Sequence, residues 1–362
     1  MTAGATSRFF SYDRLHTFTG KIFLAMGVPE PDAALATNVL LSADLRGVDS
    51  HGVARLSGYV RLWDAGRVNP RPNITIVHET PSTATVDGDS GLGLVVAPWA
   101  MQVAIRKAAA CGSGWVSVRN SNHFGIAGYH AMLPLEHDMI GMAMTNASPL
   151  VAPTFSKERM LGTNPIAVAV PAGQQPPFVA DFATTTVANG KLEMLQRQQM
   201  QAPVGWIQDR EGNAAIQPDE LKRGGALLPL GGDREHGGHK GYCLGAIVDI
   251  FSAVLSGANY GPWAPPFVSF LPLKDPVGVG LGHFFGAMRV DGFRPKEAFI
   301  KDMDHWISRF REAETVDGSE KVLIPGDPER QMEMHRKTTG IPLTEPVARD
   351  LQEIAEKFSV EL

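Results

Sequence analysis

Three side chains that could bind and protonate an acid recur at intervals of four residues: His51, Arg55 and Tyr59. They lead into a helix that the sequence predicts at about residues 53–65, and side chains four apart share one helix face. The planar guanidinium of arginine matches a carboxylate, and histidine can pass a proton near neutral pH. The pattern predicts a site for an anionic acid, although an ordinary solvated polar face fits it too. Ser50 beside His51 would suit a hydrolase, but no nucleophile turn surrounds it.

A second polar group, Asn-Ser-Asn-His-Phe-Gly at residues 120–125, follows a predicted strand at residues 115–119. Open α/β sheets hold ligands at the carboxyl ends of their strands, so Asn122 and His123 are candidate site residues. The alternative is a turn dictated by asparagine, serine and glycine.

The histidines do not form a convincing metal site. His123, His130 and His137 are seven residues apart, but Pro134 interrupts any single helix across them. Cysteine or carboxylate ligands at a suitable spacing are lacking nearby. We therefore predict no metal.

Glycine-rich segments offer several places for a nucleotide. The pairs at Gly91/Gly93 and Gly280/Gly282 resemble dinucleotide-binding turns, but the first lacks an acidic ribose partner and the second runs into a predicted strand. A standard Rossmann site is therefore not favoured. Residues 229–241 are a better phosphate site, because they open a helix and include Lys240. The alternative is a flexible loop that merely begins that helix.

Composition limits the function further. The 362 residues are 44% apolar and 20% charged, which excludes a disordered protein. The net charge of −5 favours neither a nucleic acid nor an anionic membrane surface as partner. The N-terminal residues 1–10 show no targeting signal and no apolar run reaches the ~20 residues of a membrane span. Two cysteines, Cys111 and Cys243, predict a reducing, cytoplasmic location.

The order of predicted elements indicates an α/β protein with two domains. Helical patterns fill the first 70 residues and return after about residue 295, whereas short strand-like runs alternate with helices between them. Strands are predicted at residues 74–77, 84–87, 115–119, 140–146, 166–170 and 284–290. We expect a mainly helical domain from residues 1–74 plus 295–362, with an α/β domain at residues 75–294 inserted into it.

Several short motifs occur in a characteristic order along the chain. They are Ser50-His-Gly, Asn120-Ser-Asn-His-Phe-Gly, Gly162-Thr-Asn-Pro, Asp181-Phe-Ala-Thr, Gly190-Lys, Leu228-Pro-Leu-Gly-Gly, His239-Lys-Gly-Tyr and Pro325-Gly-Asp-Pro. In this order they resemble the type-2 malate/L-lactate dehydrogenase family over residues 8–358. That family also includes ureidoglycolate and sulfolactate dehydrogenases, diketogulonate reductase and piperideine-2-carboxylate reductase. One departure from it, residues 263–266 (Trp-Ala-Pro-Pro), adds bulk that would reshape the pocket.

The resemblance implies a homodimeric oxidoreductase with a non-Rossmann cofactor domain, which interconverts a 2-hydroxy acid and its 2-oxo acid with NAD or NADP, NAD being favoured. His51 or His123 would be the catalytic acid–base group. The implied substrate-binding residues are Ser50, Arg55, Tyr59, Asn122 and Thr163. The implied cofactor-binding residues are Ala147, Ser148, Asp181, Phe182, Ala183, Thr184, Thr185, His239, Lys240, Gly326, Asp327 and Pro328.

Two alternatives stay open. A cyclic imino-acid reductase of the same family would share these motifs, and a non-catalytic nucleotide-binding sensor could keep the cofactor residues without either histidine. Because both histidines are present, we favour the enzyme. We expect His51 to exchange the proton, since it shares a helix with Arg55, and the near-neutral limb of the pH–rate profile to depend on it.

Overall fold

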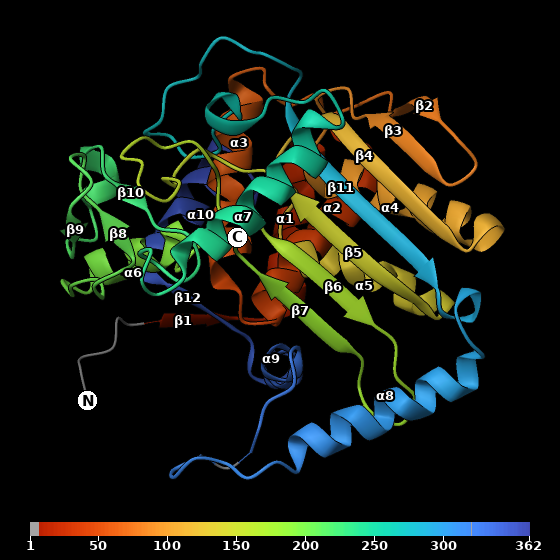
Figure 1. Cartoon of the computed structure of the whole chain (residues 1–362). Helices are drawn as coiled ribbons and strands as arrows, with labels where there is room; N and C mark the ends of the chain where they lie inside the picture. Colours follow the sequence, from red (N-terminus) through yellow and green to blue (C-terminus); the bar gives the residue numbers. More distant parts are fainter. Residues whose placement is uncertain (1–6, 320) are drawn as a thin grey trace.

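The structure is a computed structural model that describes residues 7–319 and 321–362. Residues 1–6 lie outside it, so most of the segment in which we expected no targeting signal is not described. Figure 1 shows a twisted sheet with helices on both of its faces.

A seven-stranded mixed sheet forms the centre. In spatial order its strands are β2 (Thr75–Glu79), β3 (Thr83–Asp87), β4 (Ser113–Ser121), β11 (Leu281–Arg289), β5 (Met139–Thr145), β6 (Ile166–Val170) and β7 (Phe178–Phe182). Strands β3 and β4 run parallel, and the other neighbouring pairs run antiparallel. The six predicted strands are therefore confirmed, and a short run of mostly apolar residues at 178–182 adds the seventh.

Helices cover the two faces of this sheet differently (Figure 1). α4 (Gly93–Cys111) and α5 (Ala127–Met132) lie behind it, while α7 (Gly238–Asp249) crosses in front and continues into a π-helical turn, Ile250–Val254. α4 is long and apolar enough to cross a membrane, but 61% of its most apolar window is buried inside the structure. Its apolar side chains fill a core against the sheet.

The two ends of the chain meet in a helical unit. Its elements are β1 (Ser7–Phe10), α1 (Tyr12–Ala25), α2 (Glu30–Leu45), α3 (Leu56–Asp64), β12 (Ile341–Thr344) and α10 (Glu345–Phe358). β1 pairs with β12, and Phe18, Leu40 and Leu351 share one core. This packing supports a domain built from both ends, while the exact division at residues 74 and 295 stays a prediction.

α8 (Lys296–Arg311) was expected in the helical domain, but it is attached to the turn between β6 and β7 of the sheet. The carboxylate of Asp304 accepts backbone N–H bonds from Gly173, Gln174 and Gln175, in the turn between β6 and β7. The helix is therefore fastened to the sheet domain.

A small lobe and one further helix complete the fold. The lobe holds α6 (Asn189–Arg197), β8 (Ile207–Gln208), β9 (Ala214–Ala215) and β10 (Ala226–Leu227). α9 (Asp327–Thr339) begins beside the N-terminal end of β7, where Pro325 O accepts the N–H of Val179, and packs along α2. The two-residue strands β8, β9 and β10 were not predicted, because runs this short are too short to show alternation of apolar and polar residues.

Candidate active site

The segment that carries His51 and Arg55 is not one helix. It forms two separate 3₁₀ turns, Asp49–His51 and Val53–Arg55, before α3 begins at Leu56. The prediction that His51, Arg55 and Tyr59 share the face of a single helix is therefore wrong.

The physical reason is a buried carboxyl group from α2, that of Asp44. Asp44 Oδ2 accepts the backbone N–H of Val53 at 2.8 Å and so takes the place of a helical hydrogen bond. The chain passes so close to Asp44 that a Cβ on Gly52 would lie 2.0 Å from its carboxylate oxygen. Burial raises the pKa of Asp44 to about 8, while its bond from Val53 opposes this rise. Gly52 is thus required where the two turns meet.

The two turns and the loop after β4 bring the two candidate histidines together. The rings of His51 and His123 are stacked, with centroids 5.7 Å apart and planes 19° apart. Ser50 Oγ and His51 Nδ1 are hydrogen-bonded at 2.9 Å, and Tyr59 Oη lies 2.7 Å from His123 Nδ1. All four side chains were expected at the site, and the structure places them in one cluster.

The tautomer of His123 follows from its partners. The backbone N–H of Gly125 donates to His123 Nδ1 at 3.3 Å, so this nitrogen is an acceptor. Burial raises the pKa of Tyr59, which keeps its hydroxyl protonated and able to donate to the same nitrogen. In neutral His123 the proton therefore lies on Nε2.

Both histidines are neutral at pH 7. Burial, followed by the positive charge of Arg55, lowers the pKa of His51 to about 4. Burial also lowers the pKa of His123, and the nearby His51 and Arg55 lower it further. A neutral imidazole can take a proton at a ring nitrogen that carries none, and the pH limb expected near neutrality moves to more acidic pH.

Arg55 is fixed beside the histidines by its own segment. Its Nε donates to the backbone oxygen of Ser50 at 2.5 Å. α6 comes close on another side, since a Cβ on Gly190 would lie 3.3 Å from a guanidinium nitrogen of Arg55. The guanidinium is therefore held close to both imidazoles, as a carboxylate clamp requires.

Asn122 precedes His123 and fixes the loop that carries it. Its amide nitrogen donates to the backbone oxygens of Arg67, Ser90 and Gly91. The glycine turn that resembled a dinucleotide site is filled by this loop, because a Cβ on Gly93 would lie 2.1 Å from the backbone oxygen of Asn122. The side-chain amide nitrogen of Asn122 thus hydrogen-bonds the backbone of the protein itself.

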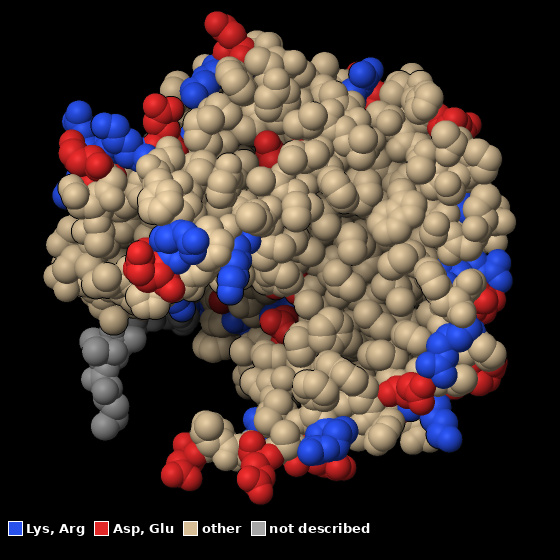
Figure 2. Space-filling model, in the orientation of Figure 1, with Lys and Arg blue, Asp and Glu red and all other residues tan. Residues whose placement is uncertain are grey.

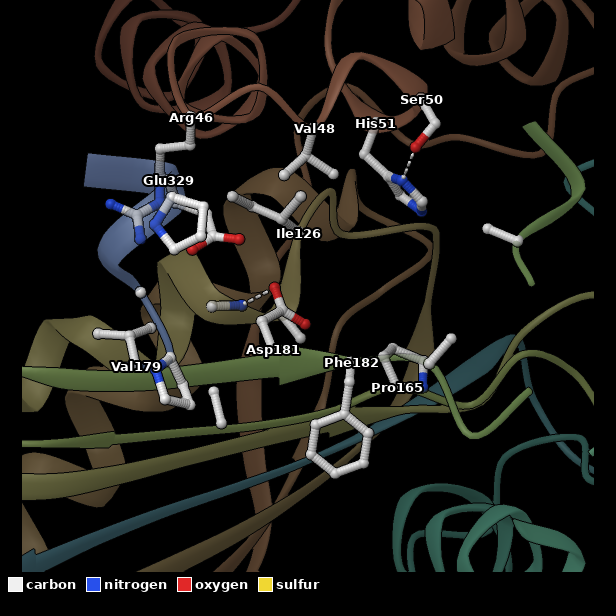
Figure 3. A pocket seen from close by; sticks show the side chains of 18 of the residues that line it. Arg46, Val48, Ser50, His51, Ile126, Pro165, Val179, Asp181, Phe182 and Glu329 are labelled. Atoms are coloured by element: carbon white, nitrogen blue, oxygen red, sulfur yellow. Dashed lines mark hydrogen bonds between the residues drawn. The ribbon is translucent and has the colours of Figure 1, made fainter. Parts of the chain in front are cut away.

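A cavity of about 550 Å³ extends from Ser50 and His51 to α9. Figure 3 shows Ser50 and His51 at one end, Arg46 and Glu329 at the other and Asp181 between them. The full lining is Arg46, Val48, Ser50, His51, Gly125, Ile126, Ala127, Gly128, Thr163, Pro165, Val179, Ala180, Asp181, Phe182, Ala183, Ala188, Leu323, Ile324, Pro325, Gly326, Pro328 and Glu329. Its size suits an extended organic ligand.

Asp181 offers a carboxylate to this cavity. Its Oδ2 accepts the backbone N–H of Gly128 at 2.7 Å (Figure 3). The surrounding protein partly removes it from water and raises its pKa to about 6, with Gly128 and Arg46 opposing the rise and Glu329 adding to it. Above pH 6 it is an anionic acceptor, suited to hydroxyl groups.

The other residues expected to bind a cofactor divide into two groups. Phe182, Ala183, Gly326 and Pro328 line the cavity, as does Thr163, which was expected to bind substrate. The residues outside the lining are Ala147, Ser148, Thr184, Thr185, His239, Lys240 and Asp327.

Most of this second group has a structural partner. Thr184 Oγ1 donates to the backbone oxygens of Thr163 and Asn164, and Thr185 Oγ1 donates to that of Val187. The Asp327 carboxylate bonds Arg311 and Arg330 and accepts the N–H of Ile324.

The four remaining members of the second group are His239 and Lys240 at the start of α7, and Ala147 and Ser148 after β5. His239 contacts Arg234 at the exposed start of α7, where Lys240 is also exposed. Ala147 N donates to Asn164 Oδ1, and Ser148 Oγ accepts the N–H of Phe267. For Ser148 the observed partner is thus a loop of the protein.

Sequence reasoning missed two charged residues of the cavity, Arg46 and Glu329. Glu329 directly follows the Pro325-Gly-Asp-Pro motif but was not included in it, and Arg46 belongs to none of the motifs. Arg46 Nη1 pairs with Glu333 on α9 at 3.3 Å. The helical spacing of Glu329 and Glu333 was the available signal, because it places both carboxylates on one face of α9.

A second hollow of about 310 Å³ lies beside the two turns. Arg55, Gly58 and Arg61 line one side of it, Glu193 comes from α6, and Phe267 and Phe270 come from the loop before β11. Arg55 lines this hollow and donates to the backbone oxygen of Ser50, which is one of the residues that line the larger cavity. The two spaces are therefore neighbours at this pair of residues.

Within residues 7–319 and 321–362, no group of three or more histidine, cysteine or carboxylate side chains is placed to hold a metal ion.

Known proteins resemble this chain over nearly its whole length. Residues 10–352 match the malate/L-lactate dehydrogenase family. The malate dehydrogenase of Pyrococcus horikoshii is 44% identical over 350 residues, which cover 96% of this chain and 95% of the relative. The L-sulfolactate dehydrogenase of Methanocaldococcus jannaschii is 37% identical, with 93% of each chain covered. The crystal structure of malate dehydrogenase from Entamoeba histolytica superposes with a TM-score of 0.91 at 33% identity, covering 99% of each chain.

A mixed α/β fold and a site of paired imidazoles and a guanidinium, together with these relatives, define an oxidoreductase that interconverts 2-hydroxy acids and 2-oxo acids with a nicotinamide cofactor. The chain belongs to the malate/L-lactate dehydrogenase family.

Proposed function

We propose that the enzyme reduces a doubly anionic 2-oxo acid, of the oxaloacetate or sulfopyruvate type, and oxidises the matching 2-hydroxy acid. The observation that supports this is the second hollow, because both Arg55 and Arg61 line it and only one carboxylate, Glu193, opposes them. Two cations can bind the two anionic groups of such an acid. Relatives named for malate and for sulfolactate agree with this choice.

The test is a rate matrix of NADH and NADPH against oxaloacetate, sulfopyruvate, pyruvate and piperideine-2-carboxylate, with and without a chelator. We expect kcat/KM for the two doubly anionic acids to exceed that for pyruvate by at least about tenfold, since a charged hydrogen bond contributes roughly 1.5–3 kcal/mol. We expect the chelator to have no effect. A preference for the cyclic imine would favour an imino-acid reductase, and no turnover would favour a nucleotide-binding sensor.

We propose that the larger cavity binds the cofactor. We place the nicotinamide end beside His51 and Thr163 and the adenosine end between Asp181 and Glu329, all of which line the cavity. When bound, the nicotinamide carries the hydride that is exchanged with the acid. The cavity lies along β7, and the sheet has a single parallel pair, so we propose a non-Rossmann mode of binding.

The protein's own groups then move and orient the other reactants. Arg55 binds the carboxylate, and the Nε2–H of His123 donates a hydrogen bond to the carbonyl oxygen. His51 gives this oxygen a proton in reduction and takes it back in oxidation. Because the pKa of His51 is low, the imidazole is neutral before substrate binds and can accept the proton during oxidation. The negative charge of a bound acid favours the protonated form of His51, which is needed for reduction.

We expect the enzyme to prefer NADH over NADPH by at least about tenfold in kcat/KM, because two carboxylates at the adenosine end repel a 2′-phosphate. The variants Asp181→Asn and Glu329→Gln should each reduce this preference. Glu345→Gln is the control, since Glu345 pairs with Arg8 at the surface. Equal use of both cofactors by the unmodified enzyme would contradict the assignment.

A direct binding measurement completes this test. Affinity for NADH should fall as the pH decreases through about 6, the pKa of Asp181, because protonation removes an acceptor for the ribose hydroxyls. Asp181→Asn should bind NADH more weakly at pH 8 and show no such pH dependence in a fluorescence titration.

We also propose a homodimer that forms over α7. The outer side of α7 and the turn after it expose apolar side chains: Ile247, Ile250, Phe251, Val254 and Leu255 are 41–60% exposed. Figure 2 shows few charged side chains over the later part of α7 and the turn after it, whereas Lys240 is exposed at the start of the helix. A second copy of the same face is the complementary partner for an uncharged surface, as in a two-fold dimer.

Light scattering on the protein as it elutes from a size-exclusion column should therefore give a molar mass of about twice the chain mass of 39.0 kDa. Ile250→Glu should shift the protein towards a monomer, because it buries a charge in the interface. Phe293→Asp, at a position that is 76% exposed and away from α7, should leave the mass unchanged. A monomeric unmodified protein would remove the proposal.

A cytoplasmic location completes the proposal. Cys111 and Cys243 are both exposed and unpaired, which suits a reducing compartment.

A further inference from the structure

A loop of residues 261–280 leaves the end of the α7 segment and returns to β11, and its base is closed by hydrogen bonds. Asn259 Oδ1 accepts the N–H groups of Val277 and Gly278. Asp249 on α7 accepts the N–H of Gly261 at 2.8 Å. The loop is therefore anchored at both ends, and Phe267 lies within it.

Phe267 is fixed through its backbone as well. Its N–H donates to Ser148 Oγ at 2.8 Å, and its carbonyl oxygen accepts from the Arg61 guanidinium. The preceding carbonyl, of Pro266, accepts from Arg67 Nη1 at 3.1 Å. Three side chains from outside the loop thus hold this one point of it.

The ring of Phe267 is packed against the candidate catalytic groups. Its centroid lies 4.5 Å from that of His123 and 5.3 Å from that of Tyr59. The absence of a side chain on α3 makes room for it, because a Cβ on Gly58 would lie 2.4 Å from its Cζ. Phe267 also lines the hollow that holds Arg55 and Arg61. An acid with its carboxylate on Arg55 and its carbonyl group at the histidines must therefore place its remaining substituent near this ring.

We infer that Phe267 is a specificity-determining residue, which forms a rigid wall that admits 2-oxo acids with small or slender substituents and excludes branched or aromatic ones. This inference rests on the proposed place of the acid beside Arg55. The bond that the Phe267 N–H donates to Ser148 Oγ and the bond that its carbonyl oxygen accepts from Arg61 fix the main chain at this point. The ring itself is confined by its packing against His123, Tyr59 and the backbone at Gly58, so a bulky acid cannot turn it aside without disturbing these neighbours.

The experiment compares Phe267→Ala and Phe267→Leu with the unmodified enzyme. The ratio of kcat/KM for phenylpyruvate to that for oxaloacetate should rise at least about tenfold in Phe267→Ala, since a methylene-sized change in a pocket alters discrimination by roughly 10–200-fold. Phe267→Leu keeps most of the volume and should give a smaller rise. It also serves as the folded variant if the alanine variant does not fold.

A binding measurement gives a readout without turnover. Calorimetry with N-phenyloxamate and with oxamate, which are unreactive mimics of a large and a small 2-oxo acid, should show the same change in preference. Leu273→Ala is the matched control, because Leu273 belongs to the same loop but is 62% exposed. Its two ratios should equal those of the unmodified enzyme.

The outcomes separate this inference from the proposed function. Unchanged ratios in folded Phe267 variants would overturn the wall, even if Arg55→Lys weakens the binding of every acid. If neither Phe267 nor Arg55 affects any acid, the acid binds elsewhere and both proposals fail.

Discussion

Replacing His51 by asparagine should lower kcat by about 10²–10⁴-fold in both directions, which is the usual contribution of general acid–base catalysis. Asparagine keeps a hydrogen-bonding group but cannot exchange a proton in this pH range. Steady-state rates of reduction and of oxidation provide the measurement. His137→Asn is the matched control, because His137 is exposed and is not among the residues that line the cavity. It should retain the full rate.

The choice of His51 over His123 rests on their hydrogen bonds. His123 Nδ1 accepts from Gly125 and Tyr59, so its Nε2 already carries a proton and cannot take another from the alcohol. The Ser50 hydroxyl can accept from His51 Nδ1, which leaves Nε2 of His51 free as a base. His123 is suited to orienting the carbonyl oxygen by donating from Nε2.

The pH dependence distinguishes the two histidines. With its pKa lowered to about 4 by burial and Arg55, His51 stays neutral as the pH falls from 7 to about 5. At a saturating concentration of the cofactor, kcat/KM for the hydroxy acid should therefore stay constant over that range and decrease only towards pH 4. His51→Asn should remove this limb and His123→Asn should keep it. The reverse pattern would transfer the proton exchange to His123, and full activity in both variants would refute the mechanism.

The sheet was the part of the fold most accessible from sequence. The apolar run at residues 166–170 became β6 with the same bounds, because alternation and β-branched residues are local properties. The break in the helix around Gly52 was not accessible in this way. It depends on the carboxyl group of Asp44, eight residues before Gly52, which accepts the N–H of Val53 across the turn.

The site shows the same limit for single residues. Residue type correctly drew attention to the loop that holds Asn122 and His123, but it could not show that the Asn122 amide bonds three backbone carbonyls. Glu329 was missed because its role comes from the cavity that it shares with Asp181, which is distant in the sequence. Distances between distant segments decide such roles. The spacing of Glu329 and Glu333 indicates a shared helix face, but it does not indicate the cavity that Glu329 lines.

Arg55→Lys should raise KM for the acid by about 10–100-fold while the Kd for the cofactor changes little. Lysine keeps the charge but loses the planar fork that binds a carboxylate through two hydrogen bonds, and such charged bonds contribute roughly 1.5–3 kcal/mol. In the native enzyme the Arg55 Nε bonds the backbone oxygen of Ser50, which leaves the terminal nitrogens for the acid. A single ammonium group cannot keep both arrangements.

Arg71→Lys is the control, because the exposed Arg71 also donates from Nε to a backbone oxygen, that of Gly27. Steady-state KM and a fluorescence titration of NADH give the two quantities. If Arg55→Lys changes neither KM nor kcat, the carboxylate clamp lies elsewhere in the hollow, with Arg61 as the next cation to replace.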